Sequence, residues 1–187
     1  MQAVRGGDLA KLGSLFERHH RAVFDFLMRM TGNRAVAEDL VQDVFERTLK
    51  YRATWRDDFK FGPWLFRIAR NARADYFRRR ELTTVYSHEI DSADPAAGPE
   101  RKLEVESEAA RLQRALLALR ADKRELIVLA RYREMKYEAI AELLGVDVGT
   151  IKVRVHRALN ELRDIFLTQE SRRPCDVKTS PSNSRTI

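Results

Sequence analysis

Apolar residues recur at helical spacing along most of this chain, and the pattern is interrupted once before the C-terminal tail. The interruption covers residues 81–105, where the run from Asp91 to Pro99 is rich in Asp, Ala, Pro and Gly, a composition typical of a linker. We find no stretch with the period of two that a half-buried strand requires. The pattern therefore predicts an all-α fold of two small helical domains joined by a flexible acidic linker.

Charge divides the chain at the same places. Residues 1–80 hold 17 Lys and Arg against 10 Asp and Glu, whereas residues 81–105 hold 2 against 6. Residues 106–167 hold 12 against 10, and the polar tail at 168–187 holds 4 against 2. We predict a first domain over 1–80, a linker over 81–105, a second domain over 106–167 and a disordered tail over 168–187.

The total composition restricts the partners. The net charge of +7 favours a polyanion, with nucleic acid first and an anionic membrane surface second. No apolar run approaches the roughly 18 residues that a membrane span needs, and the N-terminus lacks the apolar core of a signal peptide. Cys175 is the single cysteine, so we expect no disulfide and a cytoplasmic location.

Three helices are predicted in the first domain. Asp8 is placed to cap a helix that runs to about Met30 and ends at Gly32-Asn33. A second helix is expected from about Ala35 to Tyr51. A third begins near Pro63, which suits a first helical turn, and is expected to end at Arg78–Arg80.

The segment from Tyr137 to Leu159 is typical of a helix-turn-helix. Gly145 can adopt the positive φ that the turn requires, and Asp147 is well placed to cap the following helix. A plain helical hairpin with a solvated basic face is the alternative. The coincidence of small residues, turn glycine, cap and basic outer face favours DNA binding, with the start of the second helix in the major groove. The predicted contact residues are Gly149, Thr150, Lys152, Val153, Arg154 and Arg157.

The third helix and the loop before it interleave aromatic residues with arginines. Arginines can follow a nucleic-acid backbone, exposed aromatics can stack on unpaired bases, and Asn71 can hydrogen-bond the edge of an extruded base. Trp64 and Phe66 have an equally open alternative as core residues. The predicted single-strand contacts are Trp55, Phe59, Phe61, Trp64, Arg67, Arg70, Asn71, Arg73 and Arg78.

One side of the second helix is acidic, which is unusual in a basic domain. Spacings of three and four residues place these side chains on a common face. A solvated face is the default interpretation, and docking onto a basic partner is the alternative. The residues concerned are Glu38, Asp39, Gln42, Asp43 and Glu46.

Together these motifs resemble the extracytoplasmic-function (ECF) group of sigma-70 factors, over roughly residues 8–167. The run from Ala37 to Phe45 resembles the polymerase-binding helix of region two, and Trp64 to Asn71 resembles the helix that melts and reads the minus-10 element. The run from Val148 to Ala158 resembles the region-four helix that reads the minus-35 element. All three motifs occur in the family's order, with an acidic linker between the second and third.

This resemblance implies an alternative sigma factor that binds core RNA polymerase and directs promoter-specific transcription initiation. It implies that the acidic face grips the β′ coiled coil of the polymerase, with the β flap as a further contact. It places the pocket for a flipped minus-10 base at Asn71 and the loop from Trp55 to Gly62, and an anti-sigma factor is the further partner expected. Asp147 and Val153 depart from the small hydroxyl residues frequent in the family, and Val153 is expected to alter which base or phosphate is touched.

No catalytic constellation or metal site is predicted, and we expect neither a cofactor nor enzymatic activity. His19 and His20 are adjacent on a helix and therefore diverge by about 100°, while His156 lacks a carboxylate or Cys at ligand spacing. Asp57-Asp58 is interpreted as a solvated loop pair. A free-standing helix-turn-helix regulator would leave the acidic and aromatic faces unused. A nucleic-acid-processing enzyme would need an acidic triad or nucleophile that we do not find.

Overall fold

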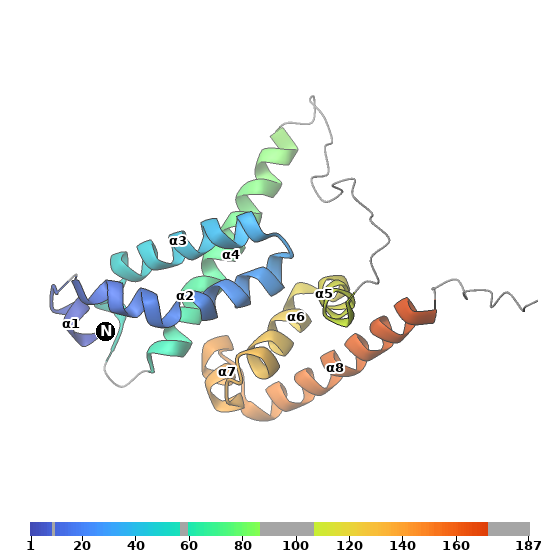
Figure 1. Ribbon diagram of the computed structural model, residues 1–187. Helices are drawn as coiled ribbons and strands as arrows, with labels where there is room; N and C mark the ends of the chain where they lie inside the picture. Colours follow the sequence, from blue (N-terminus) through green and yellow to red (C-terminus); the bar gives the residue numbers. More distant parts are fainter. Residues whose placement is uncertain (9, 57–59, 87–106, 172–187) are drawn as a thin grey trace, which may run out of the picture.

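The computed structural model describes residues 1–187 apart from residue 9 and residues 57–59, 87–106 and 172–187. Within these described ranges every regular element is helical (Figure 1). The first block comprises α1 (Gln2–Arg5), α2 (Ala10–Thr31), α3 (Arg34–Lys50), the 3₁₀ turn η1 (Arg52–Thr54) and α4 (Phe61–Tyr86). The second block comprises α5 (Glu108–Ala118), α6 (Ala121–Ile127), the π-helical turn η2 (Val128–Tyr132), α7 (Tyr137–Leu144) and α8 (Val148–Ser171).

The predicted break between the first two long helices is confirmed. Gly32 has a φ of 69°, in the left-handed region where a side chain would be strained. The side chain of Asn33 then accepts a hydrogen bond from the backbone N–H of Val36 at 3.1 Å, which caps α3. The chain therefore reverses within two residues, and α2 and α3 pack side by side.

Two helix ends differ from the sequence prediction. The helix expected to stop at Arg80 continues to Tyr86, and the last helix, expected to end at about 166, continues to Ser171. The charged and polar residues in both extensions carry no stop signal, since the next prolines are Pro95 and Pro174. Residues 81–86 therefore belong to α4. The remainder of the predicted linker and most of the predicted tail lie outside the described residues.

The helix expected over 122–133 changes type partway. After α6, the backbone N–H of Arg133 donates to the carbonyl of Val128 at 3.0 Å, the i→i+5 bond of a π turn. Glu134 then takes a φ of 50°, and the N–H of Met135 bonds the carbonyl of Leu129 at 3.0 Å. The turn at Glu134 redirects the chain into α7. Four-residue α1 was not predicted, and it buries Val4.

The main hydrophobic core is shared by the two blocks. Phe26 of α2 and Phe66 of α4 meet edge to face at 5.4 Å between ring centroids. Buried Leu129 and Ile140 of the second block belong to the same cluster. A smaller core lies within the second block, between α5, α6 and α8. The blocks are therefore packed against each other, an arrangement that the linker prediction did not include. In the described part of the chain, no helix combines the length and apolarity of a membrane span.

Candidate functional site

The helix-turn-helix forms as predicted. Gly145 lies in the left-handed region, with φ 67° and ψ 36°, and ends α7. The carboxylate of Asp147 accepts the backbone N–H of Thr150 at 2.8 Å and also the hydroxyl of Thr150. These hydrogen bonds, first from the side chain and then from the backbone of Thr150, lower the pKa of Asp147. Asp147 is thus a charged cap on α8, and the hydroxyl of Thr150 is engaged in that cap.

The two faces of α8 have opposite chemistry. Ile151 and Val155 are fully buried against the rest of the second block. On the outer face the side chain of Val153 is 49 % exposed, which makes it one of the more exposed apolar residues described. The other exposed positions on the predicted recognition face are Gly149, Lys152, Arg154 and Arg157, and Thr150 is half-buried. The start of α8 therefore presents three cations beside a helix N-terminus, an arrangement suited to phosphates and base edges.

The basic residues of α4 divide between two faces of the helix. Arg67, Asn71 and Arg78 are exposed, and their spacings of four and seven residues place them on one side. Arg70 and Arg73 are half-buried on another side, turned toward the second block. The exposed face therefore has the composition expected of a single-strand contact, with one amide between two guanidinium groups.

The predicted stacking aromatics are mostly not at the surface. Trp55 is 7 % exposed and Trp64 is 5 % exposed, and both belong to the shared core. For Trp64 the core alternative is the one that the structure adopts, and Trp55 is corrected in the same way because its ring packs under the first block. Phe61 is half-buried beside Trp64, at 5.8 Å between ring centroids. Phe59 lies outside the described residues, as do Asp57 and Asp58.

The acidic face of α3 is exposed except at one position. Glu38, Asp39, Gln42 and Glu46 are exposed, and Glu38 forms an ion pair with Arg34 at 2.8 Å. The prediction that Asp43 is free at the surface is wrong. Its side chain is 32 % exposed and bonds Nε of Arg47 at 2.8 Å, because Arg47 lies one turn further along the same helix.

The structure adds a charged residue that the sequence pattern did not distinguish. Glu125 on α6 is 6 % exposed, and its carboxylate lies 3.0 Å from Nε of Arg70. Burial raises the pKa of Glu125, against the opposing influence of Arg70 and Arg73. In the sequence Glu125 resembles any solvated helix residue, since its partners are more than fifty positions away.

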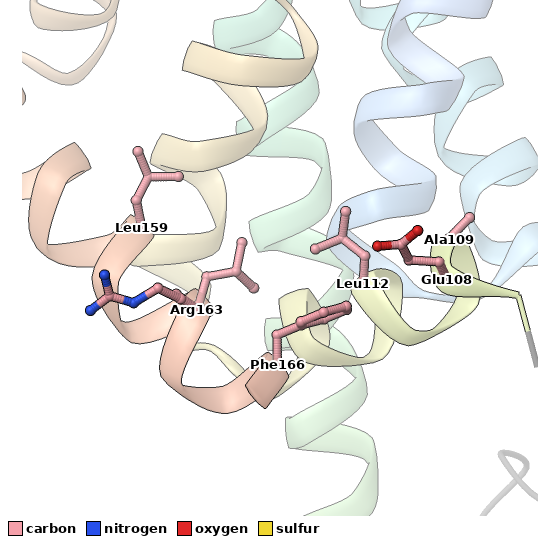
Figure 2. A pocket seen from close by; sticks show the side chains of 7 residues that line it. Glu108, Ala109, Leu112, Leu159, Arg163 and Phe166 are labelled. Carbon is pink, nitrogen blue, oxygen red and sulfur yellow. The ribbon is translucent and has the colours of Figure 1, made fainter. Parts of the chain in front are cut away.

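Two open grooves accompany these faces. One, of about 530 Å³, lies between α2 and α3 and is lined by Phe16, Phe24, Glu38 and Gln42 among others. The other, of about 490 Å³, lies between the start of α5 and the end of α8, where Leu112 and Phe166 approach each other (Figure 2). Neither was predicted. No group of three potential metal ligands occurs in the part of the chain that the structure describes.

Comparison with known families places these surfaces in context. The family described as "Sigma-70 region 2" matches residues 15–83, and the one described as "Sigma-70, region 4" matches residues 109–162. The RNA polymerase sigma factor CarQ of Myxococcus xanthus is 34 % identical over 166 residues, which cover 89 % of this chain and 95 % of that protein. The chain belongs to the ECF group of the sigma-70 family. It is an alternative sigma factor that binds core RNA polymerase and promoter DNA and directs transcription initiation.

Further relatives agree with this assignment. The ECF sigma factor SigL of Mycobacterium tuberculosis is 32 % identical over 169 residues, covering 87 % of this chain and 93 % of that protein. Among solved structures, the sigma factor RpoE of Bartonella quintana, in complex with the anti-sigma factor NepR, has a TM-score of 0.69 at 28 % identity, covering 83 % of this chain and 96 % of that one. CnrH, in complex with the cytosolic domain of CnrY, shares the fold with a TM-score of 0.68 at 24 % identity, covering 89 % of this chain and 94 % of that one. This sigma factor thus combines region 2 in its first block with region 4 in its second.

Proposed function

We propose that this sigma factor uses three separate surfaces in promoter opening. The exposed acidic face of α3 docks on the β′ coiled coil of the polymerase. The exposed face of α4 around Asn71 holds and reads the minus-10 strand, and the start of α8 reads the minus-35 element. The observation that carries the proposal is the segregation of charge, with carboxylates exposed on α3 and cations exposed on α4 and α8.

Partners and location follow from the same proposal. The β flap is the polymerase element that contacts the second block, and an anti-sigma factor is a further partner, by analogy with the RpoE complex with NepR. The protein acts in the cytoplasm with the polymerase and supplies no catalytic chemistry of its own. Support for the polymerase contact comes from the exposure of Asp39 and Glu46, since carboxylates free of internal bonds can pair with a basic partner.

The polymerase contact is tested by charge reversal at exposed positions. We expect Asp39→Lys combined with Glu46→Lys to weaken binding to core polymerase at least about tenfold, because like charges would then face each other across the interface. Asp43 is left unchanged, since its bond to Arg47 belongs to the fold. Binding of labelled protein to core polymerase without DNA provides the measurement.

A matched control carries the same change of charge elsewhere. Glu138 and Asp164 are exposed on α7 and α8, and their double replacement by Lys is expected to leave core affinity within about twofold of the wild type. Equal affinity of the Asp39/Glu46 variant and the wild type would remove α3 from the polymerase interface.

The minus-10 assignment is tested at Asn71. A base edge is accessible only after the base leaves the stack, and arginines that hold phosphates carry little sequence information. We therefore expect Asn71→Ala to keep core affinity but to lose discrimination at one minus-10 position by about tenfold, the lower end for one base contact. Transcription from single-base promoter variants measures this preference. A wild-type preference at every position would place the reader elsewhere.

A further inference from the structure

The second block covers one side of the helix assigned to the minus-10 element. Trp64 and Arg67 of α4 border a narrow crevice with Glu142 and Leu143 of α7. Figure 1 shows the start of α4 beside α7, in agreement with the contacts between these two helices. Part of α4 that a separated strand would have to reach is therefore occupied by the protein itself.

The arginines on this side of α4 are matched by a buried carboxylate. Arg70 bonds Glu125 of α6 at 3.0 Å, and the charge of Arg73 also acts on Glu125. The partners that act most strongly on Glu125 come from the other block. Its charge therefore offsets the two cations only when the blocks are packed together.

Other contacts between the blocks fix the same arrangement. Nη1 of Arg124 donates to the backbone carbonyl of Met30 at 2.6 Å, at the end of α2. The guanidinium of Arg29 lies 3.7 Å from the ring centroid of Tyr132, a close cation–π contact. With the shared apolar core, these contacts form a specific interface between two folded units.

This packing is incompatible with simultaneous contact to both promoter elements. Arg70 lines one cleft of about 410 Å³ together with Arg154 and Arg157 of α8. The minus-10 and minus-35 elements are separated by about 25 base pairs, or about 85 Å of duplex at 3.4 Å per pair. Residues assigned to the two elements thus lie on one small cleft, and the blocks have to separate before both can bind.

We propose that the second block of this sigma factor docks on α4 and holds the free protein in a closed state that shields the minus-10 face from DNA. Core polymerase and promoter DNA bind the open state. Affinity for single-stranded DNA is then reduced by the fraction of molecules that are open. The proposal rests on the assignment of α4 to the minus-10 strand, whereas closure itself can be measured without DNA.

Glu125→Lys provides the test in the full-length protein. A lysine at this position would be buried beside Arg70 and Arg73, so we expect the blocks to separate. Small-angle scattering should show a larger radius of gyration with unchanged helical circular dichroism. Affinity for a fluorescent single-stranded oligonucleotide of minus-10 composition should increase about tenfold or more.

Two control variants separate opening from added charge. Asp164→Lys makes the same change of charge at a side chain that is 69 % exposed, and it should leave the dimensions unchanged and raise affinity by no more than about twofold. Glu125→Gln keeps the size without adding a cation and should remain compact. A Glu125→Lys protein as compact as the wild type would overturn the closed state. An expanded Glu125→Lys protein whose affinity matches that of Asp164→Lys would overturn the shielding, and neither result would affect the polymerase test on α3.

Discussion

At the scale of single residues, Arg47 joins the acidic helix to the arginine-rich helix. Its Nη1 bonds Asp75 of α4 at 2.6 Å while its Nε bonds Asp43 of α3 at 2.8 Å. Arg78 bonds the other oxygen of Asp75 at 2.8 Å. The hydrogen bond from Arg47 is the main reason that the pKa of Asp75 is lowered. The network holds the two functional helices in register within the first block.

Replacing Asp75 by Asn should weaken this link. Its side chain is 32 % exposed, so we expect the free energy of unfolding at pH 7 to fall by only about 0.5–1 kcal/mol. A carboxyl with a lowered pKa stabilises the fold above its ordinary value of 3.8, and this contribution is lost as pH falls through the lowered value. Urea unfolding between pH 2.5 and 7 should show that loss in the wild type and less of it in Asp75→Asn. Parallel pH profiles would contradict the role of the network.

At the scale of elements, the turn between α7 and α8 depends on one backbone conformation. Gly145 adopts a φ of 67°, and an added Cβ would meet no atom within 4 Å. The requirement for glycine is therefore conformational and does not arise from crowding. The N–H of Val146 bonds the carbonyl of Ala141 at 3.1 Å across this turn, so the conformation also sets the direction of α8.

We expect Gly145→Ala to lower the free energy of unfolding by about 1–2 kcal/mol, the strain of an alanine in the left-handed region. Gly13→Ala is the matched control, because Gly13 lies within α2 and its added Cβ also meets no atom within 4 Å. That control should be neutral or stabilising by up to about 1 kcal/mol, since alanine favours a helix. Thermal unfolding of both variants measures the difference, and equal effects would show that the left-handed conformation is not required.

At the scale of the whole molecule, the two blocks bury a carboxylate between them. Burial is the main cause of the raised pKa of Glu125. Arg70 and Arg73, which face it from α4, lower its pKa, and Asp122 on its own helix raises it. Since the pKa remains raised in total, the packed state binds a proton more readily than the unfolded chain does.

Stability should therefore depend on pH through Glu125. Between its ordinary value of 4.5 and its raised value, we expect the free energy of unfolding of the wild type to decrease as pH rises. Glu125→Gln cannot ionise, so this slope should disappear and the variant should be at least as stable as the wild type at pH 7. Denaturant unfolding over pH 4.5–7.5 measures both curves. Identical slopes would mean that Glu125 is not buried between the blocks in solution.

Features set by local contacts were predictable from the sequence. The reversal at Gly32 and Asn33, the turn at Gly145 and the cap at Asp147 each depend on residues no more than four positions apart. Helical spacing likewise places the carboxylates of α3 on one side, because residues three and four apart are neighbours on any helix. Apolar periodicity identified the all-α fold, and three motifs in order identified the family.

The sequence by itself therefore determined the helices, their caps and the chemistry of each outer face. Only the tertiary structure decided which of those faces stay exposed. Trp55 and Trp64 are buried, and Glu125 is enclosed with Arg70, because elements far apart in sequence pack against them. Periodicity records one face of one helix and carries no information on which distant surface will cover it. The pairing of blocks is determined by the total apolar burial and charge matching of both, which exists only once the chain has folded.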